Sequence, residues 1–163
     1  RNMKISGEAK KPVIEDSDYI NETVEKIVNE HTKEMDSFVE SVHEDLRQDV
    51  SYTDEQLSEK ILKLNVILYD VIGPNFAVDI RQEISGMKQK SDYAFARKTA
   101  EGTVADKDNE AFLATQDISV LNLIYKEANK LMKSKVDRAS ELLLSLKKIL
   151  TFRIQQMGGT LDQ

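Results

Sequence analysis

The chain has 163 residues, of which 40% are hydrophobic and 32% charged, with two prolines, six glycines and no cysteine. The lack of cysteine excludes disulfides and thiolate metal sites and is compatible with a cytoplasmic protein. No continuous apolar run approaches the roughly 18 residues that cross a bilayer, so we expect no membrane partner. This length and composition are typical of one helix-rich domain with its own core.

The net charge of −6 is unevenly distributed along the chain. Residues 1–55 contain fifteen acidic and seven basic side chains, whereas residues 126–153 contain eight basic and three acidic ones. Residues 81–100 are also basic, with five cations and two carboxylates. Such asymmetry often accompanies binding of a polyanion or a partner. Solvated helix faces explain it equally well, and both interpretations stay open.

The first fifty residues predict a lead followed by an acidic arm. Residues 1–16 are polar and lack an apolar period, which indicates a disordered lead. Residues 17–50 predict an amphipathic arm helix, because apolar side chains recur at steps of three and four after a good N-cap at Asp16 or Ser17. The positions on this seam are Val24, Val28, His31, Met35, Phe38 and Val42. A narrow seam surrounded by acids is typical of a coiled-coil-like helix that packs on a partner or on its own basic body.

Residues 51–163 are predicted to form the helical body. Thr53 and Gln56 form a capping-box pattern that begins a helix over residues 54–72, and Gly73-Pro74 is expected to end it. A third helix is predicted over residues 75–101. The side chains expected on its inward face are Phe76, Ile80, Ile84, Met87, Ser91, Ala94 and Phe95. Residues 102–109 predict a loop or short hairpin, residues 111–115 a short strand or helical lead-in, and Asp117 the cap of a final helix.

The most regular pattern in the chain is the long stripe of residues 118–157, which no Pro or Gly interrupts. A second apolar row widens this stripe, and one chain offers few helices to cover it. We therefore predict a homo-oligomer. The side chains expected at its interface are Ile118, Leu121, Tyr125, Met132, Val136, Leu143, Leu146, Leu150 and Ile154. The expected fold is all-α, with three to four helices including two long amphipathic ones that assemble into a helical oligomer.

No pattern in the sequence indicates catalysis, a metal or a cofactor. His31 and His43 lie among carboxylates on the arm, but one helix supplies too few converging ligands for a metal site. The carboxylate pairs at residues 44–45 and 54–55 lie in polar surroundings that would not raise a pKa for acid–base work. The glycines form neither a dinucleotide fingerprint nor a phosphate-binding loop. We expect a protein that is not an enzyme.

A basic cluster with interleaved aromatic residues is the strongest functional signal. Its cations are Lys88, Lys90, Arg97 and Lys98, and its aromatic residues are Tyr93 and Phe95. Cations neutralise phosphates and release counterions, while an exposed aromatic ring stacks on a base without reading sequence. Several copies in a ring would multiply the few contacts that one helix offers. The alternative is that Phe95 belongs to the core and the cations only solvate the outer face.

Three short stretches give the chain a resemblance to phage recombination mediators of the UvsY type. They are residues 43–50 (HEDLRQDV), 93–98 (YAFARK) and 104–108 (VADKD), and the resemblance extends over residues 43–157. It implies a helical subunit that forms a ring through its C-terminal helices, binds single-stranded DNA and loads a RecA-like recombinase in the host cytoplasm. The DNA-contacting pair of the family falls on Arg97 and Lys98, with Lys88 and Lys90 in support and Tyr93 as a stacking group. The arm at residues 17–42 has no counterpart in the family pattern.

A second hypothesis assigns the protein no nucleic-acid role. It would be a structural or adaptor protein, such as a phage assembly factor or coiled-coil module, that works through helix-in-groove contacts of the acidic seam. Loss of partner capture on removal of residues 1–45 would favour this hypothesis. DNA binding that survives the same deletion would favour the mediator.

Overall fold

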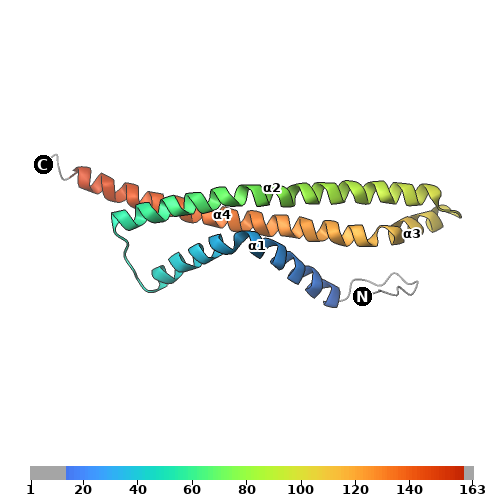
Figure 1. Cartoon of the computed structure of the whole chain (residues 1–163), viewed down its shortest axis with the longest axis horizontal. Helices are drawn as coiled ribbons and strands as arrows, with labels where there is room; N and C mark the ends of the chain where they lie inside the picture. The colour runs from blue at the N-terminus through green and yellow to red at the C-terminus, as the bar shows by residue number, and fades with distance from the viewer. Residues whose placement is uncertain (1–13, 160–163) are drawn as a thin grey trace.

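The computed structural model describes residues 14–159, and within that range the regular secondary structure is all α-helix. The helices are α1 (Ile14–Arg47), α2 (Asp54–Thr99), α3 (Val104–Ala114) and α4 (Gln116–Gly159). Figure 1 shows α2 and α4 side by side along the length of the molecule, with α1 crossing them and α3 at the end opposite the C-terminus. The predicted all-α fold with two very long helices is confirmed. Of the predicted lead, residues 1–13 lie outside the described range, and α1 already begins at Ile14.

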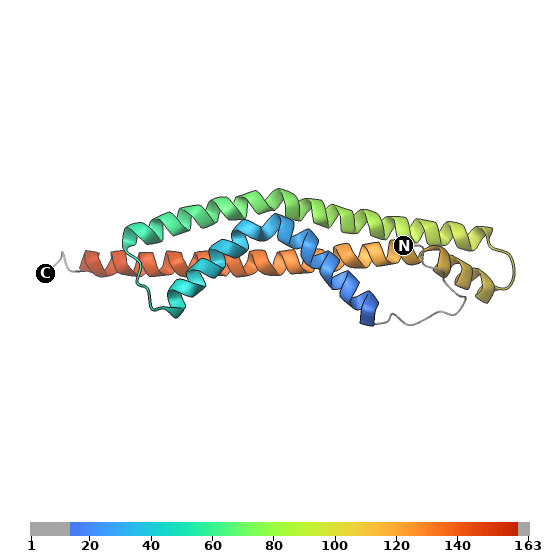
Figure 2. The same cartoon turned by 60° about the horizontal axis from the view of Figure 1, so that its bottom comes forward.

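The acidic arm, α1, packs on the body of its own chain, mainly on α4 and less on α2. Its apolar seam is buried as predicted, except that His31 is exposed and Thr32 takes its place in the core. Thr32 Oγ1 donates a hydrogen bond to the carbonyl oxygen of Val28 at 3.0 Å. Such bonding to the preceding turn often bends a helix, and Figure 2 shows α1 bent near its middle, where it meets the body. At the bend the short Thr32 side chain lies in the core, whereas the bulky His31 stays exposed.

The predicted helix end at Gly73-Pro74 is wrong, because α2 continues through both residues for a total of 46. Pro74 has no N–H to donate to the preceding turn, and an interior proline costs a helix about 3 kcal/mol. Val71 and Val78, on either side of it, belong to the core that α1 and α4 share. Burial of both sides therefore holds the helix together across the defect. Figure 2 shows the result as an outward bow near the middle of α2.

The predicted loop over residues 102–109 is also wrong, because α3 begins at Val104. Thr103 and Asp106 form a capping box, in which Asp106 N donates to Thr103 Oγ1 and Thr103 N donates to Asp106 Oδ2 at 2.9 Å. Glu or Gln is the usual residue at position N3 of this motif, and the shorter Asp makes the same hydrogen bond here. The final helix starts at Gln116, with the carbonyl oxygen of Thr115 accepting from Ser119 N at 2.9 Å. Asp117 therefore lies inside the first turn of α4 and does not cap it.

The hydrophobic core lies between the central part of α1, the first half of α2 and the middle of α4. Ala128, Met132 and Ala139 of α4 are fully buried, and the two alanines leave room for the other helices to approach closely. Two helices of the same chain thus cover the middle of the long stripe. Of the nine side chains predicted at the interface, only Leu121 and Ile154, near the two ends, are exposed. The middle of the stripe therefore needs no second copy to cover it, although this need was the reason for predicting self-association.

The second half of α2 joins α4 through polar side chains. Asn122 Nδ2 donates to the carbonyl oxygen of Gln82 and to Ser85 Oγ, both at 2.9 Å. Gln89 Nε2 donates to Ser119 Oγ at 2.8 Å. Asn129 Nδ2 reaches Gln82 Oε1 at 2.7 Å. These paired amides and hydroxyls fix the face that this half of α2 turns to α4.

Candidate nucleic-acid interface

The five predicted DNA-contacting side chains all lie on the last turns of α2, but they face different surroundings. Lys88, Lys90 and Lys98 are exposed, whereas Tyr93 is half-buried. Lys88 forms an ion pair with Asp92 at 2.9 Å. Within residues 14–159, no ion pair involves Lys90 or Lys98. These two cations are therefore free to meet a phosphate.

Arg97 and Tyr93 both turn to Asp108 of α3. Arg97 Nε donates a hydrogen bond to Asp108 Oδ1, and the Tyr93 hydroxyl lies 3.5 Å from the same oxygen. The hydrogen bond and charge of Asp108 raise the pKa of Arg97 above its ordinary value. This contact ties α3 to the end of α2, and the carboxylate of Asp108 offsets the charge that Arg97 would offer to a phosphate.

Phe95 is the exposed aromatic side chain of the cluster, with 69% of its surface accessible. The expectation that it faces inward is wrong, and so is the alternative that assigned it to the core. At 100° per residue it shares the outer side of α2 with Lys88 and Lys98. It can stack on a base, whereas Tyr93 is partly covered by its place beside α3.

Local electrostatics weaken the predicted basic patch. Folding brings α3 back against α2, and residues 81–110 contain six basic and six acidic side chains. The positive charge of residues 81–100 is thus offset by carboxylates such as Asp106 and Asp108. Exposed charges interact over roughly 10 Å at 0.1 M salt, so these carboxylates reduce the attraction for a nucleic acid.

A second basic surface, which was not selected from the sequence, lies at the end of α4. Residues 142–159 contain Lys147, Lys148 and Arg153 and no acidic residue. Phe152, one turn after Lys148, is 61% exposed. Arg153 is engaged with the body, because its Nη1 donates to the carbonyl oxygen of Tyr52 at 2.6 Å and to Asp54 at 3.1 Å. The missing carboxylates were the signal in the sequence that could have identified this surface.

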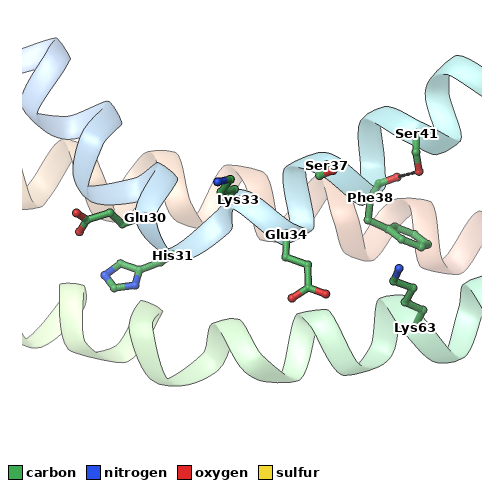
Figure 3. A pocket seen from close by; sticks show the side chains of 8 residues that line it. All are labelled: Glu30, His31, Lys33, Glu34, Ser37, Phe38, Ser41 and Lys63. Atoms are coloured by element: carbon green, nitrogen blue, oxygen red, sulfur yellow. Dashed lines mark hydrogen bonds between the residues drawn. The ribbon is translucent and has the colours of Figure 1, made fainter.

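An open hollow of about 560 Å³ lies between α1 and α2 (Figure 3). From α1, Glu34 and His31 point toward α2, and Lys63 of α2 lies below the ring of Phe38. The Lys63 ammonium is 5.9 Å from the centre of that ring. Among the described residues, no three His, Asp or Glu side chains are grouped to hold a metal. The hollow is open, and apart from Phe38 its lining residues are polar or charged.

The predicted oligomer interface is divided by the fold. Met132, Leu143 and Leu146 are buried within the chain and cannot contact a second copy without unfolding. Ile118, Tyr125, Val136 and Leu150 are half-buried, whereas Leu121 and Ile154 are exposed. Self-association itself stays a prediction, and these exposed ends are the parts of the stripe that could serve it.

The residues assigned to the inward face of the third helix are exposed instead. Phe76, Ile84 and Met87 are all more than half accessible and point away from α4.

Helix α2 contains an eighteen-residue stretch of mean hydropathy 1.4, which by length and composition alone could cross a membrane. In this fold 22% of that stretch is buried. The long core helix of a soluble protein meets the same criterion, and the absence of a membrane partner stays a prediction.

Comparisons with protein-family models, with curated proteins and with solved structures gave no match to this chain. The fold and the geometry of these surfaces, together with the sequence resemblance, are the basis for a functional proposal.

Proposed function

We propose that the protein is a non-enzymatic helical subunit that binds single-stranded DNA and helps to load a RecA-like recombinase. The observation that carries this proposal is the exposed ring of Phe95 one turn from the free cation Lys98, with the second free cation, Lys90, farther round the same end of α2. A stacking ring next to unpaired cations is the combination by which proteins hold single strands without reading their sequence. The resemblance to UvsY-type mediators supports the choice of substrate and of the recombinase.

The side chains have different roles in this proposal. Lys98 and Lys90 contact phosphates, and Phe95 takes the stacking role first assigned to Tyr93. Lys88 supports them after release from Asp92, because an exposed ion pair of this kind is worth only about 0–1 kcal/mol. Arg97 mainly holds α3 in place through Asp108. Few free cations on one subunit mean weak binding, with a salt slope that grows by only about 0.7 for each phosphate contact.

Fluorescence anisotropy of a labelled single-stranded oligonucleotide, titrated at two salt concentrations, tests this proposal. Replacing Lys90 and Lys98 by alanine should weaken binding and reduce the slope of log K against log salt by about 1.4, since each phosphate contact contributes about 0.7. Replacing Phe95 by alanine should weaken binding with little effect on that slope.

The matched control replaces Lys147 and Lys148 of α4 by alanine, which removes the same charge from the other basic surface. If this control alone weakens binding, the interface lies on α4 and not on α2. No binding at low salt would contradict a nucleic-acid role altogether. Recombinase loading is measured separately, as assembly of a recombinase filament on a strand already coated by a single-strand-binding protein.

A structural or adaptor role is the second candidate, and a different observation now favours it. The α1 seam is buried on its own chain, so it is not free to enter a partner's groove. Deleting residues 1–45 would strip Val28, Met35 and Val42 from the core and would therefore test stability more than partner capture. The exposed apolar face of α2 is the feature that supports an assembly role. Assembly without DNA binding would favour this candidate.

A further inference from the structure

The face of α2 that points away from α4 carries an apolar stripe which nothing in the described chain covers. Its side chains, between 39% and 74% exposed, are Leu62, Val66, Tyr69, Ile72, Phe76, Ile80, Ile84 and Met87. The buried side chains Leu64, Ile67, Val71 and Val78 lie on the opposite side of the same helix. A helix that is apolar on two opposite faces is stable in water only when both are covered. We call the exposed set the outer stripe.

We propose that a second copy of this chain covers the outer stripe, with two α2 helices packed antiparallel about a two-fold axis near Gly73. This inference is independent of the proposed function. Leu62 and Ile84 lie eleven residues before and after Gly73, and Val66 and Ile80 lie seven residues before and after it. In an antiparallel pair centred on Gly73, Leu62 of each copy therefore meets Ile84 of the other, and Val66 meets Ile80. A two-fold contact requires such self-complementarity.

Gly73 has the geometry that a crossing point requires. It faces solvent, and a Cβ added there would meet no atom within 4 Å. A residue without a side chain lets two backbones approach closely. The bow of α2, convex on the side away from α1 and α4 in Figure 2, makes this middle section its most prominent part. The contact is therefore closest at residues 66–80 and extends on both sides to Leu62 and Ile84.

Charge favours the antiparallel over the parallel orientation. The first turns of α2 contain Asp54, Glu55 and Glu59, whereas its last turns contain Lys88, Lys90 and Lys98. Antiparallel pairing about Gly73 places Glu59 of one copy near Lys88 of the other. Parallel pairing would place like charges side by side. Complementary charge at the rim of an interface selects its register and orientation.

The area available is sufficient for a specific dimer. Eight large side chains that each expose roughly 100 Å² offer about 800 Å², which is what one partner contributes to a standard interface. A membrane is a less suitable cover. Burying α2 in hydrocarbon would take Lys63, Asp70 and Asp79 out of water, and the cost is about 2.5–3.5 kcal/mol for a charge at the bilayer centre.

Cross-linking tests the geometry cleanly, because the chain contains no cysteine. Gly73→Cys should give covalent dimers with a short bis-maleimide at micromolar protein. Leu62→Cys alone should not, since two copies of residue 62 lie at opposite ends of the contact. A mixture of Leu62→Cys and Ile84→Cys should give the mixed dimer. Self-linking of Leu62→Cys, with or without linking of Gly73→Cys, would overturn the antiparallel pairing.

Sedimentation velocity of the unmodified chain tests the dimer itself. Val66→Glu should weaken the dimer at least tenfold with unchanged helical circular dichroism, because Val66 is exposed in the single chain. Leu144→Glu, at an exposed site on α4, is the matched control and should leave the dimer intact. A monomer at about 50 μM would refute the proposal. Flotation of the protein as a monomer with phosphatidylcholine vesicles would show that a membrane is the partner.

Discussion

Replacing single leucines of α2 tests which of its two apolar faces belongs to the core. Leu64 is completely buried, whereas Leu62, two residues earlier, is 67% exposed. Leu64→Ala removes the same atoms as Leu62→Ala, but it also leaves a cavity between α2 and its neighbours. Buried Leu→Ala replacements cost about 3–5 kcal/mol. Surface replacements usually stay within about 0.5 kcal/mol.

Urea unfolding followed by circular dichroism measures both changes. The urea midpoint of Leu64→Ala should fall, while the slope of its free energy of unfolding against urea concentration stays the same. In a thermal scan a loss of about 3 kcal/mol corresponds to roughly 6–12 °C in Tm for a domain of this size. The protein concentration must be low, because a dimer through the outer stripe would make Leu62 contribute to stability as well. Equal losses for both variants at high dilution would refute the placement of α2.

Three further predictions concern the arm, pH and the turn before α3. Lys135→Met should lower the free energy of unfolding by about 1 kcal/mol, and by less at high salt. The reason is that Lys135 Nζ donates hydrogen bonds to two residues of α1, Asp36 and, at 3.1 Å, Asn29. An unchanged urea midpoint would contradict this prediction. Burial and a hydrogen bond to Asp45 raise the pKa of Tyr52 to about 12 from an ordinary 10. The contribution of Tyr52 to the free energy of unfolding is therefore complete below pH 10 and is lost as pH rises through 12. Tyr52→Phe should reduce this loss of stability at alkaline pH, which urea unfolding at a series of pH values measures. Gly102→Ala should cost about 1–3 kcal/mol, since φ is 103° and the new Cβ would lie 2.9 Å from Asp106; Gly73→Ala, in open space, is the control for dilute samples.

Periodicity predicted the elements whose faces differ clearly. The α1 seam from Val24 to Val42 has acids all around it, so its buried side could be assigned, apart from the exchange of His31 for Thr32. The cap at Thr53 was equally clear, because both halves of the capping box are present. Gly73-Pro74 misled the prediction because local preference favours a helix end there, whereas the burial of Val71 and Val78 depends on helices distant in the sequence.

The candidate site was harder to predict because its charges depend on α3. Nothing in residues 88–98 shows that Asp108 will fold back on Arg97, since the turn at Gly102 and the capping box at Thr103 together set that contact. Phe95 was assigned to the inward face together with Ile84 and Met87. Its exposure follows from the rotation of α2, which packing against α4 fixes.

That rotation accounts for most of the difference between the prediction and the fold. The second half of α2 has two faces that could turn toward α4. The first is apolar and includes Ile84 and Met87, and the second, on the opposite side, is polar and includes Gln82 and Ser85. Burying apolar groups would favour the first choice. The structure makes the second, because Asn122 and Asn129 of α4 meet Gln82 and Ser85 with hydrogen bonds that leave few donors unpaired. An inner face joined by polar pairs and an outer face rich in Ile, Phe and Met is the reverse of an ordinary soluble helix. This reversal follows if the outer face is itself covered in the working form of the protein, which is why the α2 surface is the first place to look for its assembly.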